Sequence, residues 1–185
     1  GTIHDFYSEA DDFWPDPVKT DGAYIQHSGP PNPAAFVAHR DALLNLSIQA
    51  PALAAAFSLT KEERYAEQAV RHLRAWFVDP ATRMTPSLLY AQTVLPAKAG
   101  RPEGIIETVH LAEVAQAIPF LARAEALAKP DLDALQTWFA AYLQWLTSSR
   151  LAGLARDDKS HHGTSWLLQA VAFTRLHLAL SPNAD

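Results

Sequence analysis

Apolar side chains recur three or four residues apart over most of the chain, which is the spacing of one face of an α-helix. This periodicity begins after residue 33 and returns after each break. It predicts five helices, whose apolar positions run over Leu43–Phe57, Tyr65–Trp76, Leu111–Ala122, Leu132–Leu146 and Trp166–Leu178. No segment shows sustained alternation of apolar and polar residues, so the sequence predicts an all-α fold without a sheet.

Capping residues and prolines predict where the first helices begin, bend and end. Asn32–Pro33 fits a helix start, with the Asn as the cap and the Pro in the first turn. Pro51 is expected to kink or split the first helix. Thr60 and Glu63 have the spacing of a capping box at the start of the second helix, which Asp79–Pro80 should end.

The segments between the later helices are rich in Pro, Gly or polar residues. Residues 80–104 are expected to form an irregular loop, and a loop of this length inside a compact domain is often functional. Pro119 should bend the third helix, and Lys129–Pro130 should separate it from the fourth. Residues 153–160 are predicted to be a polar connection, and the fifth helix should stop near Ser181-Pro182-Asn183.

The first 33 residues lack helical periodicity and are rich in Pro, Gly and Asp. Apolar side chains such as Phe6 and Trp14 need a surface to pack on, so we expect an ordered arm on the domain rather than a linker. Residues 34–185 then form the helical domain. Antiparallel helix pairs build a bundle, a solenoid or an α/α toroid, and irregular pairs with long loops favour the toroid. Five helices are too few to close a ring, which predicts an incomplete toroid, the N-terminal part of such a domain.

Composition narrows the possible functions. The chain has 185 residues, of which 49% are hydrophobic, enough for one domain with a sizeable core. Its formal net charge of -5 argues against a nucleic-acid partner. No window is expected to reach the ~18 apolar residues of a membrane span, and no signal peptide is visible. The five Trp side chains offer flat faces that suit sugar rings.

Several short motifs keep a common order and spacing along nearly the whole chain. They are Asp5-Phe6-Tyr7-Ser8, Trp14-Pro15-Asp16-Pro17, Tyr65-Ala66-Glu67, Tyr90-Ala91-Gln92, Gly104-Ile105-Ile106-Glu107-Thr108 and His162-Gly163-Thr164. Together they resemble the alginate lyase domain family. The family usually has two Asn before its catalytic His, whereas this chain has Ser160-His161. The catalytic Arg and Tyr of the family have no assigned positions in this sequence.

The resemblance implies an α/α toroid that cleaves a uronate-containing polysaccharide such as alginate by β-elimination. The expected partner is therefore an acidic polysaccharide or oligosaccharide. His162 would be the base or the acid–base group, and the positive end of a helix should keep its ring neutral. His161 would donate a hydrogen bond to the substrate carboxylate in place of the usual amide. The candidate substrate-binding residues are Tyr90, Gln92, Arg101 and Trp166.

Each candidate also has a structural interpretation. His161 and His162 are equally typical of two surface side chains at a helix start. Tyr90, Gln92 and Trp166 fit a packed interior, and Arg101 fits a solvated loop. A metal site has little support, because adjacent His side chains diverge on a helix and no His-x-x-x-His spacing accompanies them. No cofactor is expected.

Two other functions are compatible with the same scaffold. A glycoside hydrolase needs two carboxylates roughly 5–9.5 Å apart, for which Glu107 with Asp157 or Asp158 is conceivable. A non-catalytic sugar-binding module would need no catalytic partners at all. The size of a uronate polymer predicts a periplasmic or secreted protein. The sequence specifies neither the polymer nor the oligomeric state.

Overall fold

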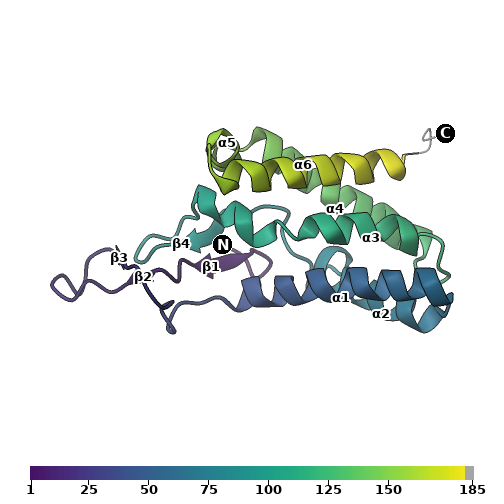
Figure 1. Cartoon of the computed structure of the whole chain (residues 1–185), viewed down its shortest axis with the longest axis horizontal. Helices are drawn as coiled ribbons and strands as arrows, with labels where there is room; N and C mark the ends of the chain where they lie inside the picture. Colours follow the sequence, from purple (N-terminus) through teal and green to yellow (C-terminus); the bar gives the residue numbers. More distant parts are fainter. Residues whose placement is uncertain (182–185) are drawn as a thin grey trace.

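Helices dominate the fold (Figure 1). The structure is a computed structural model that describes residues 1–181. Its α-helices are α1 Ala38–Thr60, α2 Glu63–Leu73, α3 Leu111–Leu121, α4 Lys129–Ser148, α5 Arg150–Asp157 and α6 His161–Ala179. A short π-helix, η1 (Arg74–Val78), extends α2, and a 3₁₀-helix, η2 (Pro102–Thr108), precedes α3.

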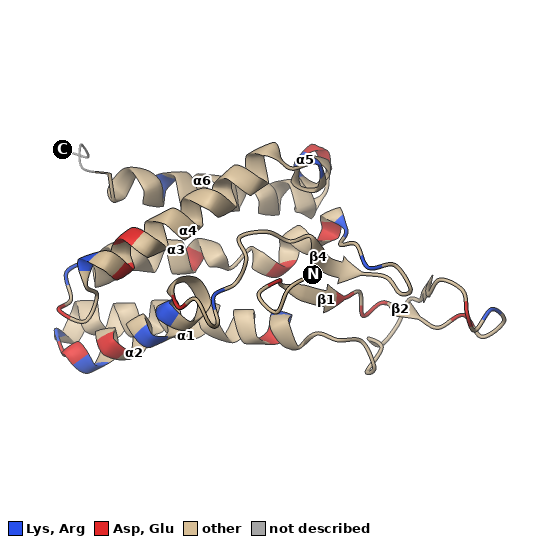
Figure 2. Cartoon of the chain, turned by 180° about the vertical axis from the view of Figure 1, so that it is seen from behind, with Lys and Arg blue, Asp and Glu red and all other residues tan. Residues whose placement is uncertain are grey.

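The long helices form two layers. Helix α3 packs between α1 and α6, and all three begin at the end of the molecule where the strands lie (Figure 1). Helix α2 packs on α1, and α4 packs on α6; the view from behind shows both on the other side of this row (Figure 2). The segments that precede α1, α3 and α6 therefore gather at one end of the molecule.

An aromatic cluster joins η1, α4 and α6 in the core. Phe77 of η1 lies against Trp138 of α4, with ring centroids 4.5 Å apart, and Phe139 lies 5.2 Å from Phe173 of α6. The Trp138 Nε1–H donates to the carbonyl of Met84 at 2.6 Å. Burial of these rings is a large hydrophobic contribution, and the Trp138 bond also fixes the loop after η1 on α4.

The prediction of a fold without a sheet is wrong in two places. Strand β1 (Tyr7–Glu9) pairs in parallel with β4 (Tyr90–Thr93), and β2 (Phe13–Trp14) pairs antiparallel with β3 (Ile25–Gln26). Strands of two to four residues are too short for an alternating pattern to be visible in the sequence. The β1–β4 pair also joins segments that are far apart along the chain, so only the tertiary structure brings it together.

The first helix starts later than Asn32–Pro33 predicted. It begins at Ala38, and Asn32 instead lies buried in the arm. The Asn32 side chain accepts a hydrogen bond from the Ala34 N–H and donates one to the carbonyl of Phe13, both at 3.0 Å. Asn32 therefore closes a turn and ties it to β2. Its side-chain amide is already hydrogen-bonded in this way, so it is not available to cap a helix.

Two further predictions concern α1 and α2. Of the two outcomes expected at Pro51, a kink or a split, the split does not occur, because α1 continues through this residue. The capping box does not form, because the Thr60 hydroxyl donates to the carbonyl of Ala56 within α1 at 2.8 Å. The Glu63 carboxylate instead accepts the backbone N–H groups of Glu125 and Ala126, each at 3.3 Å, from the turn after α3. A long-range partner thus replaces the local one.

The predicted connection over residues 153–160 is mostly helical. Helix α5 occupies Arg150–Asp157, and the Ser149 hydroxyl caps it by accepting the Ala152 N–H at 3.1 Å. Its buried side consists of the small residues Ala152 and Ala155, which give little apolar periodicity. At the other end of the chain, α6 stops at Ala179; Pro182 and Asn183 of the predicted stop signal lie outside the described residues.

We expected no segment long and apolar enough to span a membrane, but α1 meets that criterion by length and composition. One window of it reaches a mean hydropathy of 1.5. Length and composition alone are weak grounds for a span, because core helices pass the same test. In this fold, α1 packs against α2 and α3 and buries Leu43, Leu46, Ala50, Ala54 and Phe57.

Candidate active site

The two candidate catalytic histidines occupy the first turn of α6. Ser160 is the N-cap residue, in an extended backbone conformation, and its hydroxyl accepts the His162 backbone N–H at 3.3 Å. The rings of His161 and His162 lie 4.2 Å apart. His161 is exposed, whereas the His162 side chain is only 16% exposed. The structure therefore places both rings together at the helix start, with His162 held more closely by the protein.

Specific contacts surround the His162 ring. Its Nδ1 lies 3.1 Å from Asp158 Oδ2 and 3.0 Å from the Ser160 hydroxyl. The pKa of Asp158 is lowered to about 2, first because the Ser160 side chain and backbone donate to its carboxylate and then because of His162. An ionised carboxylate only accepts hydrogen bonds, so the proton belongs on His162 Nδ1. That tautomer leaves the lone pair on Nε2.

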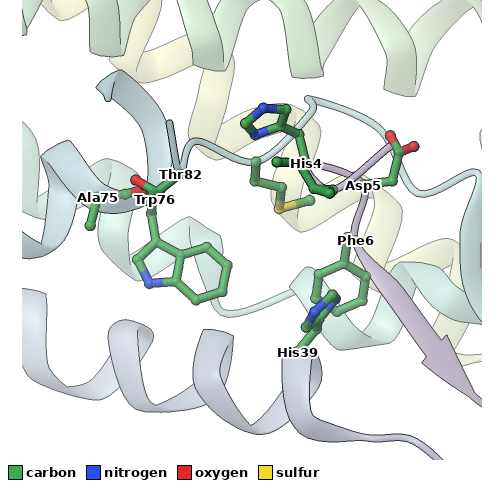
Figure 3. Close-up of a pocket in the computed structure, with 9 residues that line it drawn as sticks. His4, Asp5, Phe6, His39, Ala75, Trp76 and Thr82 are labelled. Atoms are coloured by element: carbon green, nitrogen blue, oxygen red, sulfur yellow. The ribbon is translucent and has the colours of Figure 1, made fainter. Parts of the chain in front are cut away.

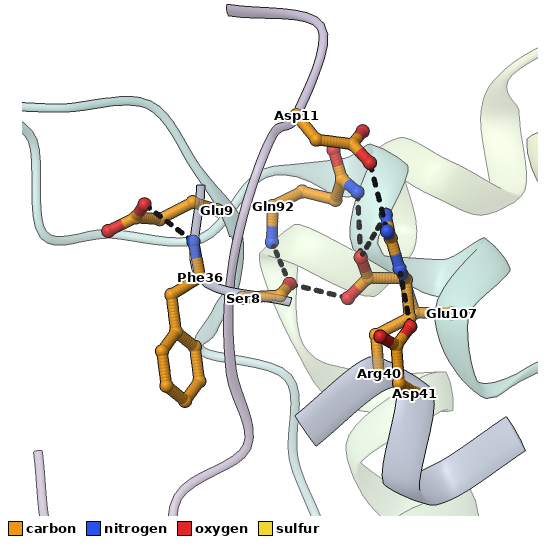
Figure 4. A network of polar contacts seen from close by, with 8 residues as sticks. All are labelled: Ser8, Glu9, Asp11, Phe36, Arg40, Asp41, Gln92 and Glu107. Carbon is orange, nitrogen blue, oxygen red and sulfur yellow. Dashed lines mark hydrogen bonds and ion pairs between the residues drawn. The ribbon is translucent and has the colours of Figure 1, made fainter. Parts of the chain in front are cut away.

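A second group of polar side chains lies inside the same end of the molecule (Figure 4). The Glu107 carboxylate on η2 accepts hydrogen bonds from the Ser8 hydroxyl at 2.5 Å and from the Gln92 side-chain amide at 2.7 Å. The Ser8 hydroxyl in turn accepts the backbone N–H of Gln92 at 2.8 Å. Arg40 of α1 approaches Glu107 at 3.9 Å and pairs with Asp11 at 2.9 Å. We call these five residues the central polar network.

Burial dominates the electrostatics of Glu107. Its side chain is 1% exposed, and burial raises the pKa of this carboxyl above its usual value. Hydrogen bonds from Ser8 and Gln92 and the charge of Arg40 oppose that rise. A buried carboxylate with this many donors is well suited to hold three chain segments together. It is poorly placed to meet a substrate.

Three of the sequence candidates belong to β4 and the segment after it. Gln92 is 8% exposed, has a φ of 56° in the left-handed region, and donates its amide to Glu107. Tyr90 is half-buried in β4, opposite Tyr7 of β1. The Arg101 guanidinium lies 5.0 Å from the ring centre of Phe13 and pairs with Glu103 at 2.6 Å. Protein partners thus already engage Gln92 and Arg101.

Trp166 lies one turn beyond the histidines, between α6 and α4. Its indole Nε1–H donates to the carbonyl of Leu146 at 2.9 Å, and the side chain is half-buried against the core. These contacts dock α6 on α4 through Trp166. Its contribution to substrate binding stays a prediction, as do those of Tyr90, Gln92 and Arg101.

Helix η2 connects the histidines to the central polar network. Two turns after His162, the buried amide of Gln169 donates to the carbonyl of Ile105 at 3.0 Å and accepts from the Thr108 hydroxyl at 2.9 Å. Glu107, on the same short helix, belongs to the network on the β1–β4 side. The structure therefore gathers the candidates into two groups flanking η2: His161, His162 and Trp166 on α6, and Tyr90, Gln92 and Arg101 around β4.

The sequence reasoning missed three members of the central polar network: Ser8, Asp11 and Arg40. The only available signal for Ser8 was its place in the Asp5-Phe6-Tyr7-Ser8 motif. Arg40 follows His39 in a helix that the sequence revealed only through the spacing of its apolar residues, and that spacing says nothing about a polar residue. Their partners lie far away in the sequence, and Ser8 is 99 positions from Glu107. A local pattern could not reveal these contacts.

A separate cavity of about 260 Å³ lies between the arm, α1 and η1 (Figure 3). The side chains of His4, Phe6, His39 and Trp76 face it. His39 Nδ1 accepts the backbone N–H of Tyr7 at 3.1 Å, and burial lowers the pKa of the ring, so His39 is neutral with its hydrogen on Nε2. None of the six candidate residues, all within the described range, lines this cavity.

The candidate site offers no cluster of metal ligands. Within residues 1–181, no group of three His, Cys, Asp or Glu side chains is arranged to hold a metal ion. The expectation that the two adjacent His side chains diverge is wrong, because their rings lie 4.2 Å apart. Their surroundings differ, since His162 contacts Asp158 and His161 is exposed to solvent.

Comparisons with known proteins agree with the geometry of the fold. The alginate lyase family matches residues 1–176. Among solved structures, the chain is similar to an alginate lyase from Bacteroides ovatus, with 30% sequence identity and a TM-score of 0.87. That match covers 96% of this chain and 47% of the other, so the chain spans about half the length of this relative. No curated protein matches the chain. Because the family match covers nearly the whole sequence, the chain belongs to the alginate lyase family.

Proposed function

We propose that this chain carries part of the active site of a polysaccharide lyase, which cleaves a uronate-containing polymer such as alginate by β-elimination. Family membership over residues 1–176 supports the reaction class. The observation that carries the site is His162, whose Nδ1 is occupied by Asp158 and whose Nε2 is left to accept a proton. We also propose that the helices belong to an α/α toroid.

Elimination from a 4-linked uronate places three demands on the protein. The substrate carboxylate must be neutralised, the C5 proton removed and the O4 leaving group protonated. In the simplest form, His162 Nε2 takes the C5 proton, and the C5–H electrons form the C4–C5 double bond as the C4–O4 bond breaks. The imidazolium then gives its proton to O4, which returns His162 to its neutral form.

His161 fits the neutralising role. It is exposed beside His162 and lies at the positive end of α6, where an anionic group is favoured. A donated hydrogen bond from its ring would stabilise the charge that develops on the carboxylate, a contribution typically worth ~3 kcal/mol. Tyr90, Gln92, Arg101 and Trp166 are proposed to contact sugar units next to this point.

The hydrolase alternative is not favoured. It requires two carboxylates on opposite sides of the same sugar, roughly 5–9.5 Å apart. Glu107 is 1% exposed and is hydrogen-bonded to Ser8 and Gln92. Asp157 is engaged by Arg156 at 2.7 Å, and Asp158 by His162. The carboxylates considered for this chemistry are therefore held by other side chains.

The decisive experiment follows ultraviolet absorbance while the protein is incubated with alginate and a panel of other polyuronates. Elimination creates a conjugated double bond that absorbs in the ultraviolet, whereas hydrolysis creates none. We expect absorbance to rise with at least one polymer and to be lost in His162→Ala. The exposed His177, near the other end of α6, gives a matched control, and His177→Ala should keep the activity.

Two outcomes would contradict the proposal. New reducing ends without the ultraviolet signal would indicate a hydrolase. Binding of a polymer without any cleavage, unchanged in His162→Ala, would indicate a sugar-binding module. A periplasmic or secreted location is proposed with the function, because the polymer is too large to be a usual cytoplasmic substrate. Fractionation of cells that produce the protein would test that location.

A further inference from the structure

We infer that Asp158 is a positioning residue for His162, which fixes the tautomer and orientation of the ring. This inference rests on the proposed function, because it assigns Asp158 a role in that reaction. The resemblance to the family implied the histidine but no acidic partner for it. The contact between them comes from the structure alone, where Asp158 Oδ2 lies 3.1 Å from His162 Nδ1.

The geometry allows only one tautomer to satisfy this contact. A carboxylate has no hydrogen to give, so His162 must donate from Nδ1. The Ser160 hydroxyl, 3.0 Å from the same nitrogen, accepts the His162 backbone N–H as the cap of α6. It can share the Nδ1–H with the carboxylate. The Ser160 backbone N–H also donates to Asp158 Oδ1 at 2.7 Å, which holds the carboxylate in place.

Gly163 makes this close packing possible. The carbonyl oxygens of Arg156 and Asp158 occupy the space that a Cβ at Gly163 would need, so a side chain there would collide with the Asp158 backbone. The end of α5 therefore lies against the first turn of α6. This contact brings the Asp158 side chain back toward a histidine four residues later. A glycine is required here because the space is absent, not because of an unusual φ.

Such a carboxylate contributes in two ways. In the neutral ring it places the hydrogen on Nδ1, so the Nε2 lone pair is the one that can accept the C5 proton. It also stabilises the imidazolium that forms when Nε2 takes that proton, because the new positive charge faces a fixed negative one. Asp158 itself stays ionised and transfers no proton. Its neighbour Asp157 points to Arg156 instead, so the two adjacent acids have different roles.

The test compares Asp158→Asn with Asp157→Asn by nitrogen NMR of the imidazole groups. The His162 signals are assigned by their absence in His162→Gln. In the native protein we expect the neutral form of the ring to carry its hydrogen on Nδ1. Asp158→Asn should lose this preference, because an amide can also donate to Nδ1, whereas Asp157→Asn should keep it. An unchanged tautomer in Asp158→Asn would overturn the inference, whatever the activity of the protein.

Kinetics supply the second readout. On a polymer that the native protein cleaves, Asp158→Asn should lower kcat by about tenfold or more with little change in KM. A positioned base typically contributes about 10²–10⁴-fold to the rate. Asp157→Asn should retain kcat. Circular dichroism of both variants shows whether α6 is intact. If Asp158→Asn keeps the native kcat, Asp158 has no positioning role. If no polymer is cleaved at all, the proposed function fails, while the tautomer result still stands on its own.

Discussion

The hydroxyl of Ser8 lies 2.5 Å from the carboxylate of Glu107, and this contact ties the arm to η2. The same hydroxyl accepts the backbone N–H of Gln92, so one side chain links β1, β4 and η2. Gln92 has a positive φ that non-glycine residues rarely adopt. Its two hydrogen bonds, one from the backbone and one from the side chain, offset the cost of that conformation.

Replacing Ser8 with Ala should destabilise the fold. The Gln92 N–H and one Glu107 oxygen would lose their partner inside a buried region, which costs about 1–3 kcal/mol. Urea unfolding followed by circular dichroism measures this loss. Ser148→Ala is a suitable control, because the Ser148 hydroxyl is exposed and only bonds back to the carbonyl of Gln144 in its own helix. Equal stability of the two variants would contradict the role of Ser8.

Glu107 should make stability depend on pH in an unusual direction. Burial raises its pKa above the ordinary value of 4.5, so the folded state holds the proton more tightly than the unfolded state does. Its contribution to the free energy of unfolding is then largest below pH 4.5 and declines as pH rises through the folded pKa.

Glu107→Gln removes this titration while keeping the shape of the side chain. The difference in unfolding free energy between the native protein and the variant should shrink as pH rises from 4.5. Urea titrations at a series of pH values measure it. A difference that grows over the same range would show that the hydrogen bonds from Ser8 and Gln92 outweigh burial.

His39 should act in the opposite sense. Burial lowers its pKa below 6.5, so the unfolded state binds the proton more readily. Its stabilising contribution is fully present above pH 6.5 and is lost as pH falls toward the folded pKa. His39→Asn keeps an acceptor for the Tyr7 N–H but cannot titrate in this range. Relative to this variant, the native protein should lose stability on acidification; a constant difference would contradict the burial argument.

Two glycines should respond to the same substitution in opposite ways. A Cβ at Gly104 would lie 2.6 Å from the Cβ of Ala91, so Gly104→Ala should cost about 1–3 kcal/mol by overpacking η2 against β4. A Cβ at Gly153 meets nothing within 4 Å. Gly153→Ala should therefore stabilise α5 by about 0.5–1 kcal/mol, since Ala favours the helix. Thermal unfolding of both variants checks the pair, and a destabilised Gly153→Ala would refute the packing described for α5.

The start of α6 shows which contacts a local sequence pattern can predict and which it cannot. Ser160, His161 and His162 were predicted at a loop-to-helix boundary, and the structure places Ser160 as the cap and both histidines in the first turn. Residues four positions apart or fewer decide this boundary, which is why the sequence could reveal it. Asp158 was within the same reach, but its pairing with His162 depends on how α5 packs at Gly163.

The sequence by itself determined the helical character of the chain, because apolar residues at helical spacing are a local property of residues 38–179. It also determined the family, because the motifs that identify it are recognised by their order and spacing along the sequence. Only the tertiary structure decided what Gln92, Glu107 and Arg40 do. Their polar groups are buried, and a buried polar group must find a partner wherever the fold supplies one. Such partners come from distant segments, and their identity therefore appears only when the chain has folded.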